Sequence, residues 1–233
     1  MITGTSQRMK RMDISPKLDI AMDGFKLAES AEDFETLLGV QIQPDLKWTK
    51  QIDELKSKLK TRLTGLSKVR HIVPTAASRK TVAEGIFNSS LIYCIPLWGG
   101  GEKGDMQDLQ ILQNRAAQHV LRLPRRSHRN EMFDRLDWMT VNQLVFYHTV
   151  ITVFKIRQTG EPEYLAEHVQ NDNFRGSLIV PATNLTLAKK SFCYRGGDSW
   201  ISLPSTIRNI KKVIPFKRAL KRWTMDNIPR FQE

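Results

Sequence analysis

The chain has few of the features that mark secreted or membrane-spanning proteins. It contains only two cysteines, Cys94 and Cys193, which excludes a disulfide framework and a cysteine-rich zinc module. Its longest apolar runs, such as Leu91–Trp98, are too short to span a bilayer, and the first residues lack the apolar core of a signal peptide. These absences predict an intracellular protein, cytoplasmic or nuclear, that has no membrane partner.

Negative charge is also scarce. The chain has 24 Asp and Glu residues against 36 Lys and Arg residues, which gives a formal net charge of +12. Such an excess attracts phosphate-bearing partners and is typical of proteins that bind nucleic acids or anionic membranes. Hydrophobic residues make up 40% of the chain, so it is able to bury a core, as one large domain or two small ones.

Patterns that would indicate catalysis or metal binding are missing. There is no Asp-Asp pair for a two-metal site, and Asp105 and Asp108 are interpreted as residues near a helix start that complement its dipole. The five histidines have no metal-ligand spacing. Cys94 falls on an apolar helix face, which favours an inert thiol over the alternative of a nucleophile paired with a histidine. We therefore predict no catalytic residues, no metal ligands and no small-molecule substrate.

Strand patterns occupy the beginning of the chain. Leu18–Met22 and Phe25–Leu27 flank the turn signal Asp23-Gly24, and Leu37–Ile42 is predicted to be a third strand. Three short strands make a poor independent domain, and the sequence begins abruptly, with no linker ahead of the first strand. We expect these strands to be the remnant of a larger sheet in a truncated protein.

From residue 48 onward the apolar spacing becomes helical. A stripe from Ile52 to Val73 predicts a long helix that stops at Pro74, and a second helix follows as far as Pro96. Further helices are expected over residues 103–123, 130–136 and 141–157, after Pro204, and from Pro215 to about Asn227. The predicted fold is α+β and mostly α, with strands over 1–47, a helical bundle over 48–168, a linker over 169–190 and a loosely structured basic segment over 191–233.

The most informative stretch is Leu109–Arg126. Its apolar residues recur at spacings of three and four and share one helical face, while uncharged amides fill much of the rest. Pro124 stops the helix, and arginines follow in the exit loop. This pattern favours a helix that packs by one face and contacts a polyanion at its end. The alternative is a core helix whose basic end is only solvated.

The long helix before it is basic as well, and its few acidic residues lie near its start. The imbalance of charge along these two helices predicts contacts with the phosphate backbone, which position a nucleic acid without reading its sequence. The residues expected to make these contacts are Lys56, Lys60, Arg62, Arg70, Arg115, Arg122, Arg125, Arg126 and Arg129.

Several short motifs occur in an order that resembles the C-terminal part of reverse transcriptases of non-LTR (LINE, jockey-like) retrotransposons. None is specific alone, but together they span nearly the whole chain. They are Leu38–Ile42 with Leu46–Trp48, Tyr93–Gly99, Leu112–Ala117, Arg135–Val141, Pro162–Leu165, Phe192–Arg195, and the run from Trp200-Ile201-Ser202-Leu203-Pro204 through Ile207-Arg208 and Phe216-Lys217 to Leu220-Lys221. Ile201 departs from the asparagine usual in the family at this position.

The resemblance implies that residues 1–47 are the end of a polymerase palm and that residues 48–168 form a thumb-like bundle with the region after it. In this family the thumb grips the template–primer duplex, which implies RNA or RNA–DNA duplex as the partner. The Tyr-x-Asp-Asp box, whose aspartates bind the catalytic Mg²⁺ ions in the family, is absent from this sequence. The resemblance therefore implies a fragment of an RNA-directed DNA polymerase that has no activity of its own and needs no cofactor.

A second interpretation remains open. The chain is then a non-functional or domesticated remnant of a mobile element that acts, if at all, as a protein-interaction module.

Overall fold

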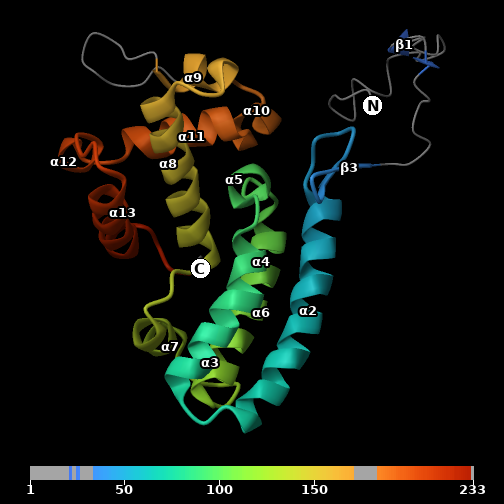
Figure 1. Cartoon of the computed structure of the whole chain (residues 1–233), viewed down its shortest axis with the longest axis vertical. Coiled ribbons are helices and arrows are strands. Elements are labelled where there is room, and N and C mark those ends of the chain that lie inside the picture. Colours follow the sequence, from blue (N-terminus) through green and yellow to red (C-terminus); the bar gives the residue numbers. More distant parts are fainter. Residues whose placement is uncertain (1–20, 23–24, 27–33, 171–182, 232–233) are drawn as a thin grey trace.

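The computed structural model describes residues 21–22, 25–26, 34–170 and 183–231 of the chain. Helices dominate these residues, and the strands form two short antiparallel hairpins (Figure 1). The fold class is α+β and mostly α, as the sequence predicts. Residues 1–20, the predicted turn at residues 23–24 and much of the predicted linker lie outside the described residues.

Among the residues that the structure describes, each strand pairs only with the other strand of its own hairpin. In the second hairpin, Leu38 has a φ of 50° and Gly39 a φ of 76°, values that a tight two-residue turn of the primed type requires. The prediction of one continuous strand over Leu37–Ile42 was wrong, because this turn reverses the chain in the middle of the run. The strands are β1 (Ala21–Met22) with β2 (Phe25–Lys26), and β3 (Glu35–Leu37) with β4 (Val40–Ile42).

Two long helices, α2 (Thr49–Ile72) and α6 (Lys103–Leu121), pack along each other. Their predicted apolar stripes form the contact, and the confirmed buried residues are Ile52, Leu55, Leu59, Leu63 and Leu66 of α2 with Leu109, Leu112, Ala116 and Val120 of α6. Burial of these side chains supplies the main driving force for the first apolar core.

The chain between these two helices returns through α3 (Ala76–Ala83), the π-helical turn η1 (Glu84–Asn88) and α4 (Ser89–Ile92). Thr75 caps α3 by accepting a hydrogen bond from the backbone N–H of Ser78. The predicted end of this segment at Pro96 was wrong. The break comes at Cys94, whose φ is 50°, and Pro96 lies inside the short helix α5 (Ile95–Trp98). Cys94 therefore caps this short helix and is only half-buried.

The end of α6 is set by Arg122, which takes a φ of 56° and caps the helix two residues before Pro124. The left-handed conformation lets the N–H groups of Arg122 and Leu123 return to carbonyl groups of the last turn. After an exit loop, α7 (Arg129–Leu136) packs against α6.

Helix α8 (Val141–Thr159) contributes to two apolar cores. Its start is fixed by a capping box between Thr140 and Gln143. Val141 and Leu144 belong to the first core, which α2–α7 build, whereas the second half of the helix, including Phe154, belongs to the second core. Because the first half of α8 is buried in one core and its second half in the other, this helix joins the two halves of the molecule.

The C-terminal residues are more helical than predicted: the helices expected after Pro204 and from Pro215 to about Asn227 are confirmed, and three further helices precede them. They form α10 (Thr186–Lys190), α11 (Phe192–Ile201), α12 (Ser205–Arg208) and α13 (Val213–Asn227), and α9 (Glu163–Gln170) precedes them. Helices α9, α11 and α13 pack on α8. Phe216 stacks on Phe154 with ring centroids 3.9 Å apart. Although this segment is basic in composition, it has apolar residues at helical spacing. Their burial in the second core orders the segment.

Candidate nucleic-acid interface

Charge is distributed unevenly along the first half of the bundle. Residues 55–83 contain eight Lys and Arg residues, residues 109–130 contain five, and neither stretch has an acidic residue. These stretches cover most of α2, all of α3 and the second half of α6, which pack against one another. The C-terminal ends of α2 and α6 lie with α3 at the lower end of the bundle in Figure 1, so the fold brings the cations of these segments close to one another.

Two contacts show that α2 and α6 run parallel. Near their starts, Lys56 forms ion pairs with Asp105 at 3.0 Å and with Asp108 at 3.2 Å. Near their ends, Arg122 Nε donates a hydrogen bond to the carbonyl oxygen of Arg70 at 2.9 Å. Parallel packing brings two helix C-termini together, and each carries a partial negative charge that favours nearby cations.

Arg79 is one of the cations placed near these two helix C-termini. It is 5% exposed, and its Nε donates to Val120 O at 2.7 Å while its Nη1 donates to Val73 O at 2.8 Å and to Pro74 O at 2.7 Å. Burial, followed by the charges of Arg122 and Arg70, lowers the pKa of its guanidinium. Sequence reasoning missed this residue, because nothing in a run of exposed-looking cations marks one of them as buried.

Arg115 of α6 and Arg122 at its end are exposed. Asp108, Arg115 and Arg122 are spaced by seven residues, so they lie along one face of the helix. That face borders α2, because Asp108 and Arg122 both contact it. Arg115 is exposed between them and has no ion-pair partner among the described residues.

Lys60 projects from α2 one turn after Lys56, and it is exposed and likewise unpaired among the residues described. Arg125 and Arg126 are exposed in the loop after α6, which is held to the helix by a hydrogen bond from Gln118 Nε2 to Arg125 O at 3.0 Å. Their side chains also have no ion-pair partner in the part of the chain that is described.

Arg129 borders the opposite side of α6. Its guanidinium lies over the ring of Phe231, 4.7 Å from the centroid, beside the α6 residues Ile111 and Asn114. We define the α6 face by the cations that surround the exposed side of this helix: Lys60, Arg70, Arg115, Arg122, Arg125, Arg126 and Arg129. These seven of the nine cations predicted to bind nucleic acid lie on α6, on the loop after it, or on α2 and α7, which pack against α6.

The other two, Lys56 and Arg62, are engaged in contacts within the protein. The Lys56 ammonium is enclosed by Asp105, Asp108 and Asp53, the last at 3.0 Å. Burial lowers the pKa of Lys56, but hydrogen bonds to the three carboxylates outweigh it and raise that pKa well above its usual value. Arg62 points to the other side of α2, where it donates hydrogen bonds to Ile86 O and Ser90 Oγ. Both are structural contacts that sequence spacing alone does not reveal.

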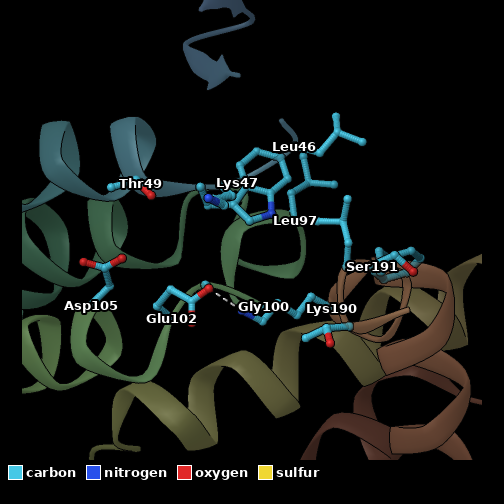
Figure 2. Close-up of a pocket in the computed structure, with 14 residues that line it drawn as sticks. Leu46, Lys47, Thr49, Leu97, Gly100, Glu102, Asp105, Lys190 and Ser191 are labelled. Carbon is cyan, nitrogen blue, oxygen red and sulfur yellow. Dashed lines mark hydrogen bonds and ion pairs between the residues drawn. The ribbon is translucent and has the colours of Figure 1, made fainter. Parts of the chain in front are cut away.

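A separate cavity of about 390 Å³ lies where α2, the α5–α6 corner and α10 meet (Figure 2). The Glu102–Lys190 ion pair crosses its rim, and its hydrogen bond lowers the pKa of Glu102. Arg195 holds this junction closed by donating to Lys190 O at 3.0 Å and Pro96 O at 2.6 Å. Burial lowers the pKa of Arg195 to about 10. We interpret the cavity as a seam between the two halves of the bundle.

Within the part of the chain that is described, no group of three or more His, Cys, Asp and Glu side chains is arranged to hold a metal ion. Over the same residues, every helix is too short or too polar to cross a bilayer. Comparison with protein-family models, with curated proteins and with solved structures finds no match for this chain.

Proposed function

We propose that the chain binds RNA or RNA–DNA duplex through the α6 face, with little preference for sequence. The observation that carries this proposal is the absence of acidic residues from the two stretches that build the basic end of the bundle. Four of the cations there, Lys60, Arg115, Arg125 and Arg126, are exposed and are not neutralised by any described carboxylate.

The physical basis of binding is the release of counterions. Each phosphate that a Lys or Arg side chain neutralises frees a condensed cation, so affinity falls steeply as salt rises. Uncharged amides on the exposed side of α6, such as that of Gln107, are able to donate hydrogen bonds to phosphate or sugar oxygens. Such contacts position a duplex and carry no sequence information.

The resemblance to non-LTR retrotransposon reverse transcriptases supports the same assignment. A thumb-like bundle that grips a template–primer duplex requires a basic surface on helices, and the α6 face offers one. We propose that the chain is a fragment of such an RNA-directed DNA polymerase and that it works inside the cell, in cytoplasm or nucleus. Because the sequence has no Tyr-x-Asp-Asp box, we expect no DNA synthesis on a primed RNA template and no cofactor requirement for binding.

The proposal is tested by charge reversal. We expect the purified chain to shift a labelled RNA–DNA duplex at low ionic strength, and the double variant Arg125→Glu/Arg126→Glu to bind at least tenfold more weakly. The matched control is Lys217→Glu/Arg218→Glu, which reverses two exposed neighbouring cations on α13. This control is expected to retain most of the affinity.

Two results contradict the proposal. One is no salt-sensitive binding of any duplex by the folded chain, which would favour the protein-interaction module if thermal unfolding is cooperative and a decayed remnant if it is not. The other is an equal loss of affinity in both double variants, because binding would then depend on net charge and not on the α6 face.

A further inference from the structure

A small pocket opens beside the α6 face. It has a volume of about 200 Å³, below the roughly 300–1,000 Å³ of pockets that bury a drug-sized ligand, so it suits a single flat group. The residues that give it its chemistry are Gln107, Ile111, Asn114, Arg129, Asn142 and Phe231. Arg129 belongs to both the pocket and the α6 face, and Asn114 is the neighbour of Arg115.

The side-chain amides of this pocket are uncharged, and some of their hydrogen-bond donors and acceptors have no partner among the described residues. Gln110 is fully used, because its Oε1 accepts from Val141 N at 2.8 Å and its Nε2 donates to Asn114 Oδ1 at 2.9 Å. Asn114 Oδ1 is therefore occupied, whereas the Nδ2 hydrogens of Asn114 have no acceptor among the described residues. Asn142 Nδ2 donates to Pro229 O at 3.3 Å, which leaves its Oδ1 as an acceptor. The pocket wall therefore presents both donors and acceptors.

The rest of the pocket is planar or apolar. Ile111 is 49% exposed, so its aliphatic side chain is open to a ligand in the pocket. The Phe231 ring carries Arg129 on it at 4.7 Å, and together they form a stacked pair at the pocket edge. Aromatic rings and arginine planes are the surfaces on which proteins stack nucleic-acid bases.

The pocket is also preformed. The ring of Phe231 packs edge-on against Phe133 with centroids 5.7 Å apart. The preceding residue, Arg230, forms an ion pair with Asp134 at 2.6 Å. These two contacts hold the C-terminal end of the chain against α7, so the stacking surface is in place before a ligand arrives, which lowers the entropic cost of binding.

We propose that this pocket accepts one unpaired base at the end of the nucleic acid that the α6 face holds. This inference rests on the proposed function and specifies its substrate: a duplex with a single-stranded overhang is bound in preference to a blunt one. A nucleic-acid base fits because it has a flat apolar face and an edge of hydrogen-bond donors and acceptors. The uncharged amides of the pocket complement that edge. A phosphate or carboxylate would leave Ile111 and the Phe231 ring without a partner.

The experiment compares three RNA–DNA duplexes of equal length: one blunt, one with a single-nucleotide overhang, and one whose overhang has no base. The abasic overhang keeps the sugar and phosphate, so it isolates the base. We expect the base-bearing overhang to raise affinity at least about fivefold over the other two, since stacking of one base on an aromatic side chain is worth this much or more. In Asn114→Ala and in Phe231→Ala, the three affinities become equal while the affinity for the blunt duplex is kept.

The outcomes separate the two proposals. Equal affinities for the three ligands in the wild-type chain overturn the pocket assignment and leave duplex binding by the α6 face intact. Preference that survives in both Asn114→Ala and Phe231→Ala also overturns it, because the base is then held elsewhere. If none of the three duplexes binds, the proposed function fails and the pocket assignment fails with it. Cooperative thermal unfolding of each variant shows that loss of preference is not loss of fold.

Discussion

Arg79 and Arg122 donate hydrogen bonds to the same carbonyl oxygen, that of Val73, at 2.8 Å and 3.2 Å. One guanidinium is buried and the other is exposed. Together with their bonds to Val120 O and Arg70 O, they satisfy carbonyl groups at the ends of the parallel helices α2 and α6. Part of the positive charge at this end of the bundle therefore stabilises the fold, and the rest is free to contact a ligand.

Replacing Arg79 separates these two roles. We expect Arg79→Met to lower the free energy of unfolding by about 2–3 kcal/mol, because three carbonyl oxygens lose a charged donor that water replaces poorly. Urea denaturation measures this. The control Arg126→Ala, at an exposed position, should change stability by less than about 0.5 kcal/mol. Arg79→Met unfolding as readily as wild type would show that the buried guanidinium is not needed.

Lys56 and Lys60 are one helical turn apart and have opposite expected roles. Lys56→Met should lower the free energy of unfolding by about 1–2 kcal/mol, since three carboxylates lose their shared cation. It should leave duplex affinity unchanged. Lys60→Met should weaken duplex binding and leave stability nearly unchanged. Denaturation and binding measurements on both variants test the pair, and a loss of affinity in Lys56→Met contradicts the placement of this residue.

Gly100 and Gly104 provide a second matched pair. A Cβ at Gly100 would lie 2.3 Å from the backbone oxygen of Lys190, whereas a Cβ at Gly104 would meet no atom within 4 Å. We expect Gly100→Ala to destabilise the chain by about 1–3 kcal/mol, because α10 has to move. Gly104→Ala should stabilise α6 by up to about 1 kcal/mol. Equal melting temperatures for the two variants would show that α10 does not sit against the α5–α6 corner.

Stability should fall as the pH drops below neutrality. Burial, followed by the charges of Lys217 and Lys155, lowers the pKa of His148. The folded chain then binds a proton at His148 less readily than the unfolded chain does. Its stabilising contribution is present above the ordinary histidine pKa of about 6.5 and is lost as the pH falls through the lowered pKa.

The check compares wild type with His148→Gln by urea denaturation at about pH 7.5 and about pH 5.5, on either side of that value. The wild-type chain should lose more stability between the two pH values than the variant does. His119, whose pKa is also lowered by burial and by nearby Arg70 and His71, remains in both proteins. An equal loss in the two would assign the pH dependence to other groups.

The helices that pack by a regular stripe could be predicted from the sequence. Ile52, Leu59 and Leu109 are spaced as their helices require, and all three are buried. The turn at Leu38-Gly39 and the break at Cys94 could not be predicted, because Leu and Cys rarely adopt the left-handed conformation and give no signal for it. Tertiary packing imposes both.

The candidate surface was predictable in part, for a related reason. Charge along the sequence shows where cations are, but not what they face after folding. Asp105 and Asp108 are 49 and 52 residues away from Lys56 in the chain. Lys56 contacts them only because α2 and α6 run parallel. The contact between Arg129 and Phe231 depends on the C-terminal end returning to α7. Such long-range pairings determine which cations remain available.

The central claim is that the α6 face binds the phosphate backbone. The most direct measurement is the slope of log K against log salt concentration for a blunt RNA–DNA duplex, for wild type and for the two charge-reversed variants. We expect a steep negative slope in wild type, a slope shallower by about two in Arg125→Glu/Arg126→Glu, and no change in Lys217→Glu/Arg218→Glu. A wild-type slope near zero, or the same change in both variants, would contradict the account.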